Sequence, residues 1–275
     1  MGLSPRERLA QLAALPDDAI DLAEAALLIA AEAYPSLDIG AYIRQLDELA
    51  REAQPLLGTM ASEPQRIIRL NQFLFVEKRF TGNQRNYYDP RNSFLNHVLD
   101  TRKGIPITLA VVYMEVARRL GLVVRGVSFP GHFLAKYAGD TEILIDAFFG
   151  QVLTEEHCRQ RLRTVLGPNA AFDRRYLRPA TTKEILVRVL ENLKQIYLKA
   201  SDDVAALSCV DRVLLFDPDS TRELRDRGLI YQRLECYRAA VADLERFLEL
   251  APDDESAEVV RATLVAIQRQ AARLH

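Results

Sequence analysis

Residues 104–150 decide how the rest of the chain is interpreted, and they read GIPITLAVVYMEVARRLGLVVRGVSFPGHFLAKYAGDTEILIDAFFG. The segment from Ile107 to Leu120 is apolar on nearly every side, which predicts a helix buried within the fold. Pro106 suits the first turn of this helix, and Gly121 suits its C-terminal cap. Three β-rich runs follow, at residues 123–129, 132–137 and 142–148. The stretch therefore predicts a central buried helix followed by antiparallel strands, which is an α+β arrangement.

The residues that precede this stretch predict a helical N-terminal segment. Apolar spacing between residues 17 and 53 indicates two helices, with a break at Tyr34-Pro35-Ser36. A third helix is expected from Pro64 to Phe80, because its apolar residues recur at helical spacing. Residues 81–90 are polar and contain glycine and asparagine, so we expect a loop there.

The C-terminal residues resemble themselves at an offset of 34 residues, which is the tetratricopeptide period. The matching pairs are Leu190 and Leu224, Tyr197 and Tyr231, Ala206 and Ala240, Leu214 and Leu248, and Pro218 and Pro252. We expect two helical hairpins in which each proline opens the next helix, followed by a closing helix over 252–275. The chain then divides into residues 1–180 and 181–275. Two repeats can either recruit a protein partner or brace the neighbouring domain, and both interpretations remain open.

Composition and charge exclude several classes of function. The net charge is −2 and 49% of the residues are hydrophobic, so nothing calls for a nucleic acid or an anionic membrane as partner. The chain carries three cysteines, Cys158, Cys209 and Cys236, without an apolar leader. An odd, widely spaced set argues against disulfides and favours the cytoplasm. Cys209 and Cys236 are expected to face helix packing, and no ligand spacing suggests a metal or a cofactor.

The stretch 104–150 resembles the transglutaminase-like core of the bacterial SirB-type family. The residues that carry the resemblance are Gly104-Ile105-Pro106, Gly121 to Arg125, Gly131-His132-Phe133 and Ile145 to Phe148, preceded by Asn86 to Ser93 and Leu95-Asn96. The resemblance implies a papain-like fold in which a cysteine begins the central helix, a histidine is its base and an aspartate orients the histidine. His132 and Asp146 match the last two roles. The cysteine position falls within two residues of Pro106, where this chain has no cysteine.

The loop between the last two predicted strands decides whether His132 and Asp146 can meet. A three-residue loop over Ala138-Gly139-Asp140 pairs Tyr137 with Thr141 and places His132 opposite Asp146. A two-residue loop would send the two side chains to opposite faces. A histidine held by a carboxylate for purely structural reasons remains an alternative to ligand binding.

Two other residues could replace the missing nucleophile. Thr108 lies close to the expected position, but a hydroxyl inside a helix usually bonds a backbone carbonyl. Cys158 follows His157 in what is expected to be the first turn of a helix capped near Thr154, and a buried cysteine is usually inert.

Three functions remain from the sequence. The leading one is a non-catalytic binding or regulatory protein, in which Asn96, Pro106, Thr108, His132 and Asp146 line a degenerate cleft that takes a peptide, side chain or small ligand. The second is an amide-bond hydrolase or acyl transferase that uses Cys158 or Thr108 with His132. The third is a scaffold whose cleft is filled by Phe129, Phe148 and Phe149. The oligomeric state is not indicated by the sequence.

Overall fold

The computed structural model describes residues 3–58, 60, 62–139 and 141–273, and the chain forms two compact units, residues 1–189 and 190–275. The sequence-based boundary between residues 180 and 181 stays a prediction. The described residues contain no helix with the length and apolar composition that crossing a bilayer requires.

The N-terminal unit begins with a group of helices. They are α1 (Pro5–Ala13), the 3-10 turn η1 (Asp17–Ala19), α2 (Leu22–Ala31), α3 (Ile39–Gly58), α4 (Glu63–Gln72) and the π-helical turn η2 (Phe73–Glu77). The two helices expected between residues 17 and 53 are confirmed. Helix α1 was not predicted, although Ser4 and Glu7 form a capping box at its start. The third expected helix is shorter, because its last turn is π-helical.

The central buried helix is confirmed as α6 (Pro106–Arg119). It is preceded by β1 (Thr81–Gly82), η3 (Pro90–Ser93), α5 (Leu95–Thr101) and β2 (Lys103–Gly104). Every residue from Pro106 to Ala117 is buried, as expected for a helix that is apolar all round. Gly121 adopts a left-handed conformation with φ 75° just beyond the helix, where glycine carries no Cβ penalty. Strands β1 and β2 pair in parallel and connect the start of α6 to the polar loop.

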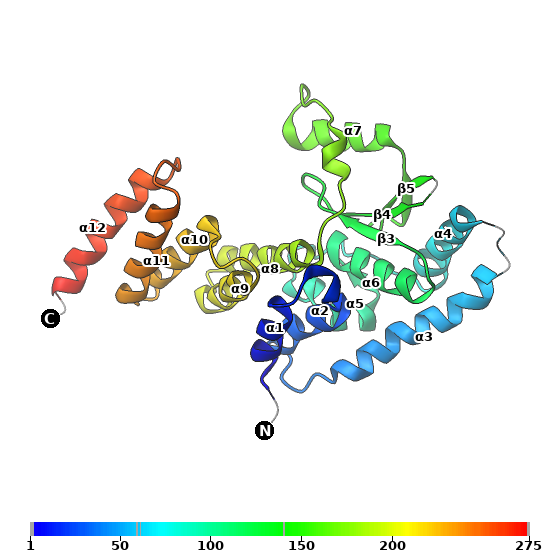
Figure 1. Ribbon diagram of the computed structural model, residues 1–275, viewed down its shortest axis with the longest axis horizontal. Coiled ribbons are helices and arrows are strands. Elements are labelled where there is room, and N and C mark those ends of the chain that lie inside the picture. The colour runs from blue at the N-terminus through cyan, green and yellow to red at the C-terminus, as the bar shows by residue number, and fades with distance from the viewer. Residues whose placement is uncertain (1–2, 59, 61, 140, 274–275) are drawn as a thin grey trace. The chain divides into compact units, whose positions relative to one another are not determined.

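A four-stranded antiparallel sheet follows α6. Its strands are β3 (Val124–Val127), β4 (Leu134–Ala138), β5 (Glu142–Asp146) and β6 (Gln151–Leu153), in the order β3-β4-β5-β6. The first three were predicted, with longer bounds, and β6 was not. Figure 1 shows α6 on one side of the strands and α7 (Glu155–Leu166) on the other. On the α7 side, an apolar cluster joins the sheet to that helix and to η4 (Arg174–Leu177). Most residues of β3, β4 and β5 are buried, whereas the edge strand β6 is largely exposed.

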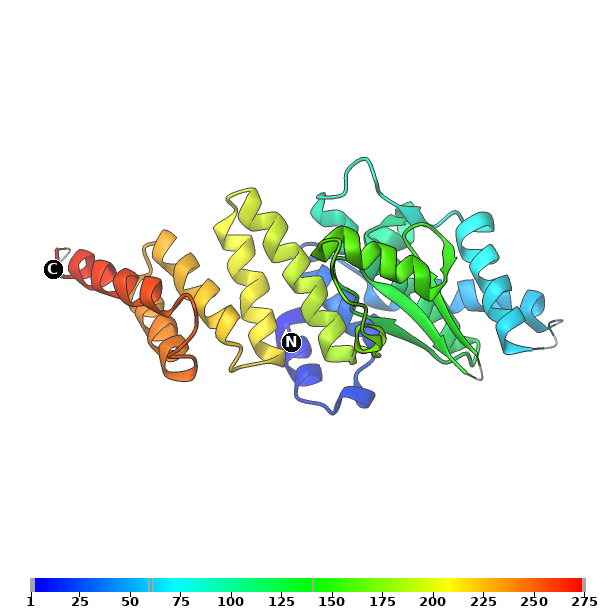
Figure 2. The same ribbon diagram turned by 90° about the horizontal axis from the view of Figure 1, so that it is seen from above.

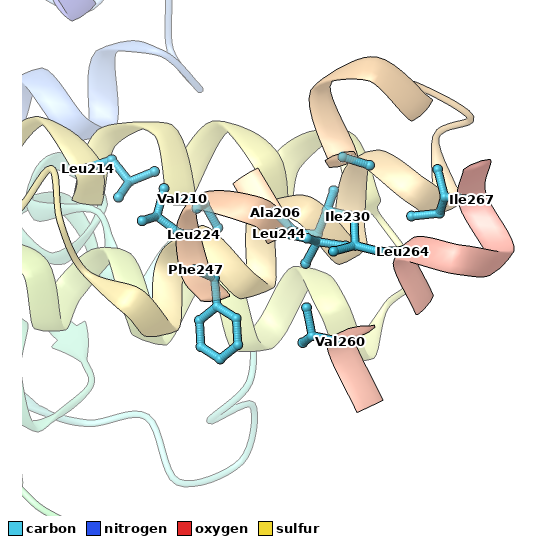
Figure 3. Close-up of a cluster of buried hydrophobic side chains, with 11 residues drawn as sticks. Ala206, Val210, Leu214, Leu224, Ile230, Leu244, Phe247, Val260, Leu264 and Ile267 are labelled. Carbon is cyan, nitrogen blue, oxygen red and sulfur yellow. The ribbon is translucent and has the colours of Figure 1, made fainter. Parts of the chain in front are cut away.

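The C-terminal unit contains the predicted helical hairpins, which follow one another back and forth in Figure 2. Helix α8 (Thr182–Lys199) begins in the N-terminal unit and ends in the C-terminal one. The helices that follow are α9 (Asp203–Phe216), α10 (Thr221–Arg233), α11 (Tyr237–Leu250) and α12 (Ala257–Arg273). Ala206 and Ala240 are fully buried in the cluster of Figure 3, as expected where paired helices approach closely. The expected position of the prolines was wrong. Pro218 and Pro252 lie in turns before the helices, so the closing helix starts at Ala257.

Candidate functional site

The structure brings His132 and Asp146 together. Asp146 ends strand β5 and is fully buried, whereas His132 lies in the turn before β4, where its amide donates to the Phe129 carbonyl at 3.0 Å. The His132 Nε2 and the Asp146 Oδ1 are 2.9 Å apart. Because the aspartate engages Nε2, the other ring nitrogen, Nδ1, is the one that is open to another group. No described residue hydrogen-bonds it.

The predicted register between the two strands was wrong by two residues. Tyr137 pairs with Ile143 instead of Thr141, and Ala138 pairs with Glu142, so the connecting loop is 139–141. Asp140, which the prediction placed in this loop, lies outside the described residues. The loop still has an odd number of residues, which leaves His132 and Asp146 on the same side of the hairpin. His132 therefore reaches the carboxylate diagonally, from just before the strand.

Two further groups hold the Asp146 carboxylate. The Phe148 amide donates to Oδ1 at 3.0 Å, and Nη2 of Arg161 lies 2.8 Å from Oδ2. The Arg161 contact is an ion pair without an aligned hydrogen bond, because Oδ2 accepts none from the described residues. Burial raises the pKa of Asp146, but His132, the charge of Arg161 and the Phe148 amide outweigh it and hold that pKa below its usual range. The carboxylate is thus ionised at neutral pH and keeps His132 oriented.

Aromatic side chains extend from His132 to the surface. The Phe148 ring meets the imidazole edge-on, with ring centres 6.3 Å apart, and it also contacts Tyr87 and Phe149 at 5.9 and 5.0 Å. Tyr87, Tyr88 and Phe149, here called the aromatic rim, are 40, 64 and 47% exposed. Of the three phenylalanines expected to fill a cleft, Phe129 and Phe148 are buried and Phe149 is not.

The start of α6 is linked to this site through Gly82. Gly82 pairs with Gly104 just before the helix, and its amide donates to the Phe148 carbonyl at 2.9 Å. A Cβ on Gly82 would lie 2.5 Å from the Phe148 ring, so only glycine allows this approach. Pro106 is the first residue of the helix. The Thr108 hydroxyl is buried, accepts from the Ile105 amide at 3.2 Å and donates to the Asn92 carbonyl at 2.7 Å.

Comparison with known proteins identifies the family. Residues 40–191 match the model of the transglutaminase-like superfamily, and residues 193–265 match a tetratricopeptide repeat model. A UPF0162 protein of Xylella fastidiosa strain Temecula1 is 39% identical over 269 residues, which cover 96% of each chain. A UPF0162 protein of Vibrio cholerae is 32% identical over 252 residues, covering 91% of this chain and 93% of that protein. Protein SirB1 of Salmonella typhimurium is 29% identical over 233 residues, covering 84% and 87%.

The chain belongs to the SirB-type family of transglutaminase-like proteins. In this SirB-type chain, the two alternative nucleophiles, Thr108 and Cys158, both have structural roles. Thr108 donates its proton to a backbone carbonyl. Cys158 is a buried residue of α7 within the apolar cluster that joins this helix to the sheet, and burial raises the pKa of its thiol and opposes thiolate formation. The N-terminus of α7 is capped as expected, since Thr154 and His157 form a reciprocal capping box.

The remaining cysteines and Asn96 lie elsewhere in the SirB-type chain. Cys209 is buried as expected, but Cys236 is exposed because it lies just before α11 and not inside the helix. Asn96 is buried in α5 and lines a separate pocket with Tyr42 and Asp100. In the described part of the chain, no three His, Cys, Asp or Glu side chains come together in a way that could hold a metal ion.

Sequence reasoning missed Arg161 and Asn92. Arg161 lies one residue before Leu162 on the buried side of α7, so its position beside the core stripe was the available signal. Asn92 is buried, accepts from the Asn83 amide group at 2.9 Å and donates to the Tyr87 carbonyl at 3.2 Å. It thereby holds the loop that carries Tyr87 and Tyr88 of the aromatic rim. No spacing within the loop would have indicated that role.

Proposed function

We propose that this chain is a non-catalytic binding protein, in which the His132–Asp146 pair and the aromatic rim recognise a peptide segment of a protein partner. The observation that carries the proposal is the state of His132. Its Nε2 is held by an ionised, fully buried carboxylate, while Nδ1 has no partner among the described residues. A rigidly oriented imidazole of this kind can exchange a hydrogen bond with a ligand.

The residues at the start of α6 argue against nucleophilic catalysis. Pro106 has no side-chain nucleophile, and the Thr108 proton already has an acceptor. Nucleophilic catalysis requires the attacking group to lie within hydrogen-bond reach of its base. The thiol of Cys158 is packed among leucine and phenylalanine side chains, so it is a component of the core.

The aromatic rim supports a peptide as the ligand. Tyrosine and phenylalanine are enriched where proteins bind proteins, because they offer large contact areas at a small cost in conformational entropy. Tyr88 is exposed by 64%, and its ring meets the Tyr87 ring edge-on at 5.3 Å. The rim thus offers apolar contact to a side chain of the peptide, and the imidazole beside it can form a hydrogen bond with a backbone amide of the peptide.

The repeat unit extends the proposal to a second contact. Tetratricopeptide repeats generally mediate protein–protein interaction, and this chain has two such hairpins with a closing helix. We therefore propose that the repeats contribute to recruiting the same protein partner or a second one.

A comparison of variants tests the role of His132 and the aromatic rim. Proteins retained from a bacterial extract by the immobilised full chain are quantified for the wild type, His132→Ala, Tyr88→Ala and the control Val76→Ala. Val76 is 68% exposed, close to the 64% of Tyr88. Each candidate partner is then purified and titrated against the same four proteins. We expect a partner whose affinity falls at least about tenfold with the first two variants and is unchanged with the control. Equal affinities for all four proteins would exclude His132 and the aromatic rim as the binding site.

A hydrolase or acyl transferase is the second candidate function, and the geometry of the His132–Asp146 pair favours it. An aspartate that fixes one ring nitrogen of a histidine and leaves the other open is the arrangement of a general base. For this function, Thr108 or Cys158 would have to leave its present partners and approach Nδ1. The acylation experiment that closes the Discussion distinguishes the two candidates.

A further inference from the structure

A second candidate site lies in the N-terminal unit, between the loop that leads into α3, the first turns of α3 and helix α5. It is a pocket of about 490 Å³. The residues that matter for its chemistry are Tyr34, Asp38, Tyr42, Asn96, His97 and Asp100. None of the pocket's lining residues belongs to the His132–Asp146 pair or to the aromatic rim, so the inference does not depend on the proposed function.

The pocket is acidic. Its described lining includes two carboxylates, Asp38 and Asp100, and no lysine or arginine. His97 adds no positive charge at neutral pH, because burial lowers its pKa. Arg44 lies 3.5 Å from Asp38, but both side chains are largely exposed and the pair is weak. Arg91 also acts on Tyr34 and His97, but it is paired with Asp89 at 2.7 Å. Arg102 interacts with Asp100 but does not line the pocket. The carboxylates of the lining therefore favour a cation.

A buried carbonyl oxygen of the pocket lining lacks a hydrogen-bond donor among the described residues. Asn96 is only 3% exposed, and its Oδ1 has no hydrogen-bond partner among the described residues. Its neighbours are already engaged, because the Tyr42 hydroxyl donates to Asp100 Oδ2 at 2.8 Å and also hydrogen-bonds the Asn96 side chain. A buried carbonyl oxygen without a donor is unfavourable, so an N–H group brought by a ligand would be stabilised there.

We propose that this pocket binds a small organic cation of the alkylammonium class. The ammonium group donates to Asn96 Oδ1 and is neutralised by Asp100 and Asp38. The rings of Tyr34 and Tyr42 flank its alkyl chain, and aromatic rings also attract cations through their faces. A free amine and the side chain of a lysine share this chemistry, and the choice of probes separates them.

Titration calorimetry on the full chain tests the proposal, with n-butylamine as the probe and 1-butanol and butyrate as neutral and anionic controls. We expect saturable binding of the amine alone. Asp100→Asn should weaken it about tenfold, and Asp38→Asn should weaken it less because that carboxylate is largely exposed. In both variants the amide still accepts the hydrogen bond that the carboxylate accepts, from the Tyr42 hydroxyl or from the Ala41 backbone. The matched control is Asp18→Asn, which removes an exposed carboxylate that does not line the pocket.

The outcomes separate clearly. Binding that is equal for butylamine and butanol, or that Asp18→Asn weakens as much as the pocket variants, would overturn the proposal, and so would no saturable binding. Circular dichroism of each variant shows that weakening does not come from misfolding. n-Butylamine and Nα-acetyl-lysine amide, which carry the same single charge, are then compared: tighter binding of the first favours a free amine as the ligand, and tighter binding of the second favours a lysine side chain.

Discussion

Replacing Asp146 with asparagine should destabilise the N-terminal unit strongly. The amide oxygen of Asp146→Asn can still accept from the Phe148 amide, but the new NH₂ group cannot neutralise Arg161. Removing one partner of a buried ion pair costs about 3–5 kcal/mol. Arg161 is 25% exposed and regains some water, so we expect a loss of about 2–3 kcal/mol in the free energy of unfolding.

Urea unfolding of the N-terminal unit can be monitored by hydrogen exchange of the peptides that cover β3 to β5. This measures the loss in unfolding free energy without interference from residues 190–275. With a slope near 2 kcal/mol/M, the midpoint should fall by about 1 M. The surface variant Asp18→Asn should change the unfolding free energy by less than about 0.5 kcal/mol. A loss from Asp146→Asn that is no larger than this control would refute the assigned role of the carboxylate.

The difference in unfolding free energy between wild type and Asp146→Asn should depend on pH with a definite sign. The pKa of Asp146 is held below its ordinary value of 3.8, so the carboxylate stabilises the folded state fully above that pH. The contribution is lost as the pH falls through the lower pKa of the folded state. The difference between wild type and Asp146→Asn should therefore be constant above about pH 5 and shrink below about pH 4. A difference that grows on acidification would contradict the ionised state.

Three further changes have expected outcomes. Gly82→Ala should cost about 1–3 kcal/mol in a urea titration, because its Cβ would collide with the Phe148 ring, whereas Gly58→Ala, with nothing within 4 Å, should be neutral or stabilising. Lys194→Met should lower the thermal midpoint of the repeat unit and cost about 3–5 kcal/mol, since it removes the ammonium that lies 2.5 Å from the buried Glu223 carboxylate and 2.7 Å from Asp226, which keeps Arg225 as a partner. Cys158 should resist iodoacetamide at neutral pH in the native protein and react only after unfolding, as mass spectrometry of the labelled peptides would show.

The repeats and the central helix were predictable because local patterns specify them. A 34-residue offset repeats the same apolar positions, and Ala206 and Ala240 occupy equivalent buried places. The same pattern could not locate the start of α12, because Pro252 suits a turn as well as a first helical turn. Helix α6 was recognisable from its continuous apolar sequence, which few exposed helices share.

The site was less predictable, because its contacts join residues that no local pattern connects. The meeting of His132 with Asp146 was expected from the resemblance, but the strand register was wrong because the loop lies one residue later than expected. Arg161 approaches the carboxylate across the fold from α7, and only the three-dimensional packing reveals it. Asn96 was expected in the same cleft, and the structure places it in the pocket beside α3.

The central claim is that the His132–Asp146 pair works without a nucleophile. Mass spectrometry of the intact protein and its peptides, after exposure of wild type and His132→Ala to p-nitrophenyl acetate, tests it most directly. We predict that neither Thr108 nor Cys158 acquires an acetyl group in either protein, because the first is committed to the Asn92 carbonyl and the second is buried in the core. An acetyl group that appears on one of them in the wild type and disappears in His132→Ala would contradict the claim.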